Sequence, residues 1–391
     1  MARNRVIYQS DALYVSKNIQ SSTSGAHVQL DRVQSANYSF TINRQDINQF
    51  GELGRIGYVA LEPPTVNLDF TYYLTDGSNE RALNFHVRNT GAGLNVDKTF
   101  LSGHMVADFS GQNFYILTST EGNDVNNTTG DSPPTTGAFI KNAIGIGNAY
   151  ITNYSLDASV GNLPTVSVSF EGANMSAVTN VGVNTGAGFT GGYSGLQLAS
   201  VQPESGTALS GTPVFLPSGK TSLGVSGIIA LRPGDILLNL GNFDDNNSGA
   251  FVRLSGTDGI HIQSASLAIP LSRTPIQRLG SRFAFARPLD LPASATLSVS
   301  AIVNEMTAEN LAAVIDQTVE KDITLQINSP GTTNAAVIYT LRKCRLDSES
   351  FSSSIGANKT VDLVFSTQYS SLNDTGRGVF MSGACPGTIF V

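Results

Sequence analysis

Four histidines, His27, His86, His104 and His261, are the residues of this chain best suited to acid–base or metal chemistry. None of them has a cysteine or a carboxylate at the spacing of a metal site, and the H-E-x-x-H signature is absent. The G-x-S-x-G turn that exposes a nucleophilic serine is also absent. We therefore expect no histidine to be catalytic or to bind a metal.

Two segments imitate ligand-binding loops without completing them. Residues 219–221 (GKT) end like a phosphate-binding loop, but Val214 stands where that loop needs its first glycine, and Pro217 removes a backbone donor. Residues 244–249 (DDNNSG) begin like a calcium loop, but Ser255 takes the place of the bidentate glutamate. A surface turn is the preferred interpretation of both, and a weak calcium site at residues 244–249 stays open.

Paired carboxylates are the remaining indication of an enzyme. Acidic residues on or beside strand-like segments could act as the two acids of a glycosidase. They are Asp69, Asp157, Glu171 and Asp362. The sequence places no two of them across a cleft, and the chain has no tryptophan to stack on a sugar. We expect solvated carboxylates on polar sheet faces, no enzymatic activity and no cofactor.

Composition favours a sheet-rich protein with many turns, because only 14% of the 391 residues are charged and 39 are glycine. The net charge of −7 provides no basic surface for holding nucleic acid. Cys344 and Cys385 make no disulfide framework, and we expect free thiols in a reducing cytoplasm. No segment resembles an export signal or reaches the ~20 apolar residues of a membrane span.

An internal repeat organises the chain. Residues 33–76 align without a gap to residues 262–305, an offset of 229 residues, so that Arg44, for example, matches Arg273. Near the end of each copy, residues 160–170 match residues 355–365 at an offset of 195. The first copy is therefore longer, and its additional length includes the polar stretch 118–136, which we interpret as an exposed loop.

Strict alternation in both copies predicts strands with one apolar face. In the first copy the expected core positions are Ala36, Tyr38, Phe40, Ile42, Val66, Leu68, Phe70 and Tyr72. In the second they are Ala265, Leu267, Ile269, Leu271, Ala295, Leu297, Val299 and Ala301. Helical spacing in residues 307–321, with a shorter counterpart at residues 78–87, predicts one helix beside the sheet of each copy.

The predicted fold is mainly β, with two tandem sheet domains that each carry one helix and a small β insertion between them. We expect an N-terminal arm over residues 1–31, which could dock on this chain or on a neighbour through Tyr8, Leu13, Tyr14 and Val15. The first domain follows over residues 32–175. A glycine-rich connector with the β insertion covers residues 176–259, the second domain residues 260–370 and a C-terminal tail residues 371–391.

This pattern resembles the tail tube proteins of tailed bacteriophages. The resemblance rests mainly on the closing hairpin of the first copy, residues 150–161 (YITNYSLDASVG) and 163–172 (LPTVSVSFEG), and covers residues 33–173 and 262–369. Distal-tail and hub proteins share the fold, so a tail-tip protein that binds a receptor or glycan is the alternative. A tail-associated glycosidase is a more distant one.

The resemblance implies stacked rings around a lumen, in which three chains with two copies each replace six single-copy subunits. It implies a virion structural protein that is assembled in the host bacterial cytoplasm and located in the tail. The implied partners are other copies of the chain, the tape measure, tail terminator and distal tail proteins, and passing DNA that is not bound specifically.

Because such a wall must not hold DNA, its lumen face should be polar and weakly acidic. The lumen candidates are Asn67, Asp69, Thr71, Ser167, Ser169, Thr296, Ser298 and Asp362. The same polar face could instead meet water or a neighbouring ring. Within the loop 118–136, the candidates for contacts between rings are Asp124, Asn126, Asn127 and Asp131, although the loop could equally be a disordered surface segment.

Overall fold

The computed structural model describes residues 11–17, 27–62, 64–89, 98–105, 111–118, 141–181, 230–239, 261–280, 284, 286–302, 320–352, 360–371 and 374–385. Several predicted features lie outside these residues. They are the segments 219–221 and 244–249, most of the helix expected at 307–321, and Asp124, Asn126, Asn127 and Asp131.

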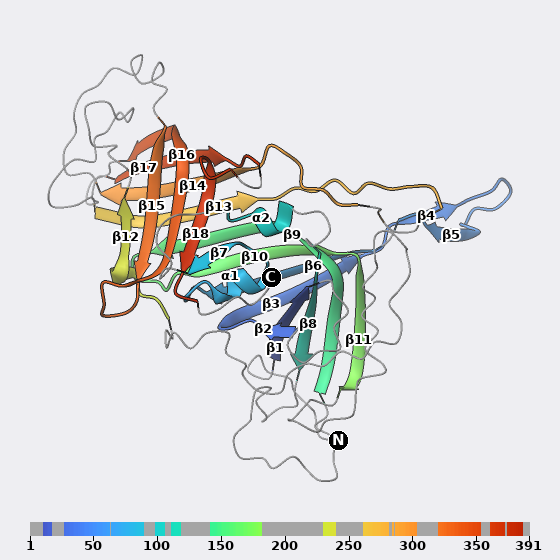
Figure 1. The fold of residues 1–391 in the computed structure, drawn as a ribbon. Helices are drawn as coiled ribbons and strands as arrows, with labels where there is room; N and C mark the ends of the chain where they lie inside the picture. Colours follow the sequence, from blue (N-terminus) through green and yellow to red (C-terminus); the bar gives the residue numbers. More distant parts are fainter. Residues whose placement is uncertain are drawn as a thin grey trace, which may run out of the picture.

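Antiparallel β-strands make up most of the described protein, as the sequence predicts (Figure 1). In the first copy they are β1 (Asp11–Lys17), β2 (His27–Gln29), β3 (Val33–Thr41), β4 (Arg44–Ile47), β5 (Gly57–Ala60), β6 (Thr65–Tyr73), β7 (Val87–Asn89), β8 (Gln112–Thr118), β9 (Lys141–Ser159), β10 (Thr165–Gly172) and β11 (Asn174–Val181). The remaining strands are β12 (Ile236–Asn239), β13 (His261–Pro270), β14 (Ser294–Ile302), β15 (Lys321–Asn328), β16 (Ala335–Ser352), β17 (Thr360–Gln368) and β18 (Gly378–Gly383).

A central sheet runs through both copies in the order β16-β17-β14-β13-β9-β10-β6-β3. The first half of this order comes from the second copy and the last half from the first copy. The two halves meet where β13 pairs with β9, from Ser264 opposite Ser159 to Pro270 opposite Asn153. We call this pairing the intrachain junction. It makes one continuous sheet out of two repeated four-strand units.

The two units share their register, including its irregularities. The β9–β10 pairing shifts between Ser169 and Phe170, and the β16–β17 pairing shifts at the aligned position between Leu346 and Ser348. The β3–β6 and β13–β14 pairings likewise shift at aligned positions. A bulge changes the face on which every later side chain of the strand lies. Because the bulges are at aligned positions, aligned residues of the two copies lie on the same face.

Each unit also has a second sheet that covers the apolar face of the central sheet. In the first copy, β1, β8 and β11 join the N-terminal half of β9, with β2 paired to β1. In the second copy, β12, β15 and β18 join the N-terminal half of β16 in the same way. Strand β12 from the connector thus takes the place that β1 has in the first copy. Leu13, Tyr14 and Val15 of β1 are buried in this chain's own core.

The two long strands bend where they pass from one sheet to the other. The bend lies at Asn148 in β9 and at the aligned Lys343 in β16, and both residues have a positive φ, 52° and 57°. Between the sheets, aromatic side chains fill the first copy, where the Phe114 ring lies 5.8 Å from Phe70 and 4.6 Å from Phe170. The repeat therefore includes the path of the backbone as well as the pattern of side chains.

The helices of the first copy are shorter than predicted. Helix α1 spans Ser78–Ala82 instead of residues 78–87, because Asn84 adopts a left-handed backbone (φ 68°) and Val87 begins β7. A second short helix, α2 (Ser102–Met105), makes the expectation of a single helix wrong for this copy. A 3₁₀ turn, η3 (Pro233–Asp235), precedes β12.

Strand β3 contradicts part of the predicted core. Its apolar residues lie on one face as expected, but Ala36 is only half-buried, and Tyr38, Phe40 and Ile42 are exposed. The remaining predicted core positions are buried, in β6 and across β13, β14 and Leu271. The reason is position, since β3 is the last strand of the central sheet and no further strand pairs with its outer edge.

A buried carboxyl group links the two copies. Glu80 of α1 accepts hydrogen bonds from the hydroxyls of Tyr72, at 2.9 Å, and Tyr154, at 3.4 Å. The Tyr154 hydroxyl lies 2.7 Å from that of Tyr339 in the second copy. Burial raises the pKa of Glu80 to about 7, because the ionised carboxylate loses its hydration, and nearby Asp76 adds repulsion. The Tyr72 and Tyr154 hydrogen bonds act in the opposite direction.

A raised carboxyl pKa means that the folded protein binds the proton more tightly than the unfolded chain. Glu80 therefore contributes stability below its unfolded pKa, about 4.5, and this contribution is lost as the pH rises through about 7. Glu80→Gln keeps a neutral acceptor for Tyr72. The variant should have a free energy of unfolding about 2–3 kcal/mol above that of the wild type near pH 8 and about equal to it near pH 4. Urea denaturation at both pH values measures this, and a difference independent of pH would contradict the prediction.

Candidate assembly interface

The predicted lumen residues lie together on one face of the central sheet. In β6, the side chains of Asn67 and Asp69 are exposed and that of Thr71 is half-buried, while the residues between them are buried. The partners in β10 are Ser169, opposite Asp69, and Ser167, opposite Thr71. A polar strip therefore crosses neighbouring strands of the first copy.

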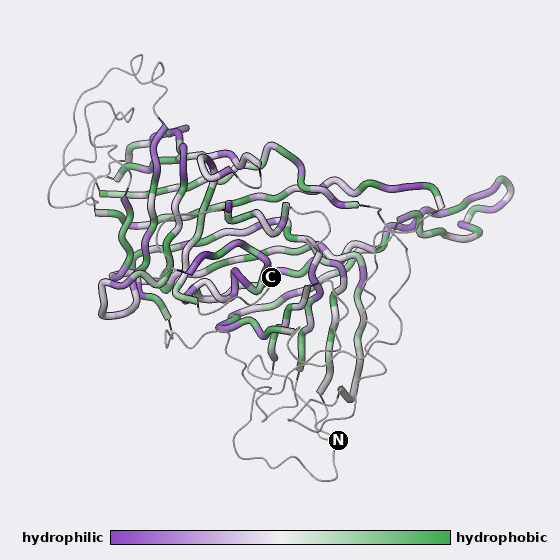
Figure 2. The backbone as a smooth tube through the Cα atoms, in the orientation of Figure 1, coloured by the Kyte–Doolittle hydropathy of each residue, from purple (hydrophilic) through white to green (hydrophobic). Residues whose placement is uncertain are grey.

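The second copy repeats this polar strip. Thr296 and Ser298 of β14 lie between buried residues, and Asp362 of β17 is exposed opposite Ser300. Asp157 of β9 joins the same face next to the intrachain junction, opposite Ser266. Figure 2 shows the alternation of hydrophilic and hydrophobic residues along these strands. The eight predicted residues thus share one surface, which spans both copies.

The charge of this surface is acidic. Among the described strand residues whose alternation places them on it, the carboxylates are Asp69, Asp157, Glu171 and Asp362, and the basic residue is Arg345 at one end. Glu171 is paired with Arg287 at 2.8 Å. These carboxylates are spread over several strands and are not set in a catalytic pair. A passing polyanion would meet mostly hydroxyl, amide and carboxylate groups.

The central sheet has two outer edges, one at each end. One edge is β3, and the other is the C-terminal half of β16, which pairs with β17 on its inner side. In the described residues, no strand pairs with the outer side of either edge. Unpaired edge strands offer backbone donors and acceptors to another strand, and so are sites of association between chains.

Comparison of aligned positions shows what a partner does at such an edge. Tyr38 and Phe40 of β3 are 43% and 55% exposed, whereas the aligned Leu267 and Ile269 of β13 are both 0% exposed. β13 differs in having β9 beside it. The same position in the repeat is therefore buried where a neighbouring unit is present and exposed where it is absent.

The second edge gives the same result. Phe351 of β16 is 43% exposed, and the aligned Leu156 of β9 is 0% exposed because β9 pairs with β13 at the intrachain junction. Each outer edge thus combines unpaired backbone with large apolar side chains. A cavity of about 430 Å³ between β1 and β3, lined in part by Leu13, Leu30 and Ala36, keeps the apolar side of the β3 edge open.

A hairpin projects from the body beside the β3 edge (Figure 1). We call residues 42–61 the first projection; it contains the β4–β5 pair and a turn at Gly51, whose φ is 93°. Its apolar side chains are exposed, and those of Phe50 and Leu53 at the turn are fully so. The aligned segment of the second copy, residues 271–290, is the second projection and turns at Gly280 with a φ of 83°.

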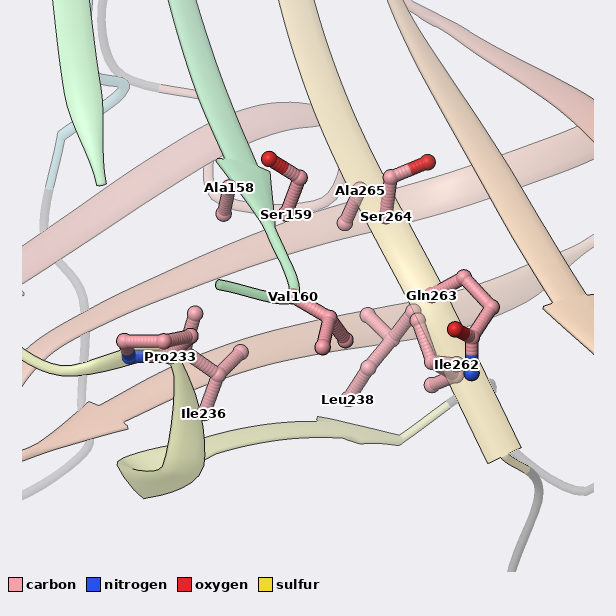
Figure 3. Close-up of a pocket in the computed structure, with 10 residues that line it drawn as sticks. All are labelled: Ala158, Ser159, Val160, Pro233, Ile236, Leu238, Ile262, Gln263, Ser264 and Ala265. Carbon is pink, nitrogen blue, oxygen red and sulfur yellow. The ribbon is translucent and has the colours of Figure 1, made fainter. Parts of the chain in front are cut away.

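The described protein has pockets besides the cavity between β1 and β3. Figure 3 shows one of about 60 Å³ at the intrachain junction, lined by residues of β9, β13 and the η3–β12 segment. Pro233, Ile236 and Leu238 lie along its lower side in this view. A volume of this size holds a few water molecules at most. The carboxylates of the polar face do not line it.

One histidine and both cysteines are buried in the core of the described protein. His104 is buried against the Phe85 ring, and desolvation lowers its pKa to about 3. Cys344 and Cys385 are free and buried, and desolvation raises the pKa of each thiol, to about 12 and about 11. The described residues contain no cluster that could hold a metal ion and no helix long and apolar enough to cross a membrane.

Sequence reasoning missed the two edges and the two projections. The signal for the β3 edge was an alternating strand with Tyr38 and Phe40, which we assigned to the core. Whether the apolar face of a strand is buried in the core or exposed at a sheet edge depends on the place of that strand in the sheet order. The sequence does not give that order.

No protein-family model matches this chain, and no curated protein matches it. Two solved structures are similar over 37% of this chain and 97% of their own chain. One is "Tail of empty GTA particle computed with helical refinement, C6 symmetry", with 16% sequence identity and a TM-score of 0.24. The other is "Virion of native gene transfer agent (GTA) particle", with 13% identity and a TM-score of 0.23. Scores this low carry no argument, and the function is argued from this chain alone.

Phe40→Ser should weaken association between chains roughly tenfold, because the exposed half of this ring would be buried by a partner strand. Val160→Ser is the control, since Val160 is 64% exposed but lies in the turn between β9 and β10 and not on an edge strand. Sedimentation velocity over a concentration series measures both. Equal effects of the two substitutions would show that the β3 edge is not an association surface.

Proposed function

We propose that this protein is a structural subunit of a phage-type tail tube, and that three chains close into a ring through their outer edges. The proposal joins the resemblance described above to one structural observation. That observation is the exposure of Tyr38 and Phe40 at positions that are fully buried in the second copy. The exposed β3 edge of one chain can be covered by the β16 edge of another chain.

Edge-to-edge pairing of this kind is head-to-tail, because β3 of one chain meets β16 of the next. Head-to-tail contacts form a closed ring when the rotation closes and a filament when it does not. Tube proteins form rings of six single-copy units, so three two-copy chains satisfy the same geometry. The resulting barrel of about 24 strands is wider than porin barrels, which already leave an aqueous channel.

The polar face supplies the inner wall in this arrangement. Asp69, Asp157 and Asp362 repel phosphate, and the surrounding serine, threonine and asparagine side chains carry no positive charge that would bind it. Glu171 is neutralised by Arg287. A wall of this composition lets DNA move along the lumen without specific binding.

This function needs no active site or cofactor. The partners are other copies of this chain within and between rings, together with tape measure, tail terminator and distal tail proteins at the tube ends. The site of action is the virion tail, after assembly in the host bacterial cytoplasm. The residues Asp124, Asn126, Asn127 and Asp131 remain our candidates for contacts between rings.

Electron microscopy of the purified protein tests the ring directly. At high protein concentration we expect rings or stacked tubes with a central hole and threefold symmetry in class averages. Monomers at every concentration, or closed particles without a hole, would overturn the proposed function.

Replacing lumen carboxylates by lysine tests the wall. Asp69→Lys together with Asp362→Lys should leave rings intact, because both side chains are exposed on the polar face. The substitution should slow DNA ejection from assembled particles, since each added lysine binds phosphate. Asp235→Lys, on the η3 turn, changes the net charge as much as either lumen substitution does alone, so it is the control for each of the two single variants. Normal ejection by the lumen variant would refute the assignment of this face.

A further inference from the structure

The second projection shows how a projection of this chain docks on a neighbouring unit. The Leu271 amide donates to the Thr152 carbonyl at 2.9 Å and continues the intrachain junction beyond the β13–β9 ladder. Further along, the guanidinium groups of Arg273 and Arg287 lie 5.3 and 5.7 Å from the centre of the Tyr150 ring. Two cations thus bind one aromatic ring of the first copy.

The two guanidinium groups at this contact have one carboxylate and two carbonyl groups as partners. Arg287 pairs with Glu171 of β10 at 2.8 Å. Arg273 donates to the backbone carbonyls of Arg287, at 2.8 Å, and His104, at 3.0 Å. Arginine on a tyrosine face, with its charge met by a carboxylate and carbonyl groups, is a stabilising contact when water is excluded.

The first projection and β16 carry the same pair with exchanged roles. The residue aligned with Arg287 is Tyr58, and the residue aligned with Tyr150 is Arg345. In the second projection the arginine is in the projection and the tyrosine is in the sheet. In the first projection the tyrosine is in the projection, and the arginine is in β16. Both Tyr58 and Arg345 are exposed in the single chain.

The surrounding charges change in agreement with this exchange. Where Arg287 needs Glu171, the aligned position in β17 is the neutral Ser366, and the projection residue is the neutral Tyr58. The Tyr58 ring lies 5.2 Å from the guanidinium of Arg44, the residue aligned with Arg273. It also lies 5.5 Å from the guanidinium of Arg55, whose charge is paired with Asp46 at 3.0 Å.

An acceptor for Arg44 is present too. The position aligned with Thr152 is Asp347, which is exposed on the bulge of β16 beside the outer edge of that strand. Its backbone carbonyl would accept the amide of Ile42, as Thr152 accepts that of Leu271. Its carboxylate would then lie near Arg44. In that docked position the carboxylate would offset part of the repulsion between Arg44 and Arg345.

We propose that the contact between chains repeats the intrachain junction in register, with the first projection of one copy docked on β16 of the next and Tyr58 stacked on Arg345. This inference rests on the proposed ring and specifies its seam. The expected strand pairs, taken from the β13–β9 register, are Asn37–Ser352, Tyr38–Phe351, Ser39–Ser350, Phe40–Glu349 and Thr41–Ser348.

The exchange of roles also selects the correct neighbour. If the second projection of one chain docked on β16 of another, Arg287 would meet Arg345, and two cations would face each other. If the first projection docked on β9, Tyr58 would meet Tyr150, and Glu171 would lose its partner. Both errors are penalised, so the intrachain junction is not readily exchanged for a contact between chains.

An engineered disulfide tests the register. The Leu271–Thr152 hydrogen bond fixes the phase of the ladder, so the aligned pair Ser39–Ser350 is a non-hydrogen-bonded pair with closely spaced side chains. Ser39→Cys with Ser350→Cys should give chains linked to one another under mild oxidation, visible on non-reducing gels. Ser39→Cys with Ser352→Cys is the control, because diagonal Cβ atoms about 7 Å apart are too distant for a disulfide.

The native thiols do not confuse this readout, since Cys344 and Cys385 are buried. Linked chains in the first variant and not in the control support the seam. Rings that form but link equally in both variants, or in neither, overturn the register while the proposed function stands. Absence of rings in the wild type would overturn the proposed function itself.

An exchange of residues tests the Tyr58–Arg345 contact. Tyr58→Arg should raise the concentration at which rings form roughly tenfold, because it sets arginine against Arg345. Arg345→Tyr should raise it by a smaller factor, through loss of the cation. Combining both with Ser366→Glu recreates the Arg287–Tyr150–Glu171 set and should restore ring formation to within about threefold of the wild type.

Rescue is the decisive outcome, because substitutions that act only on local structure would add their effects. Light scattering over a dilution series gives the ring-forming concentration, and circular dichroism verifies that each variant is folded. If the triple variant assembles no better than Tyr58→Arg alone, the Tyr58–Arg345 contact is refuted.

Discussion

The structure depends on the need of a β-strand for a neighbour on each side. Backbone donors and acceptors at a sheet edge, and the apolar side chains beside them, are satisfied only when another strand covers them. Inside this chain, the intrachain junction meets that need for β13 and β9, and Leu267 and Leu156 are buried there. At β3 and the end of β16, no described strand meets that need, which gives the described sheet two complementary ends.

Duplication makes these ends complementary. Both copies keep the same bulges and the same positive-φ bend at Asn148 and Lys343, so each presents its edges with the same spacing and orientation. A unit that pairs with its own copy along the chain can pair with the copy in another chain by the same geometry. Buried hydrogen bonds among Glu80, Tyr154 and Tyr339 link the two copies within a chain.

Much of the fold followed from alternation alone. The period of two gave the strands and the correct buried residues in β6 and β14, because a strand with one covered face must place apolar residues at every second position. Repetition of that pattern at a constant offset gave the duplication. The helix at residues 78–87 was predicted too long, because the left-handed Asn84 that ends it leaves no mark in a helical pattern. The apolar face of β3 was recognised but placed in the wrong environment.

The sequence by itself determined which residues share a face, since this depends only on local backbone geometry and spacing. Tertiary structure decided which faces are covered, because burial depends on strand order and on segments far apart in the chain. Tyr38 and Leu267 occupy one position of the repeat, yet one is exposed and the other buried, since only β13 has β9 beside it. For the same reason the exchanged pair of Tyr58 and Arg345 has meaning only once Arg287 is seen against Tyr150.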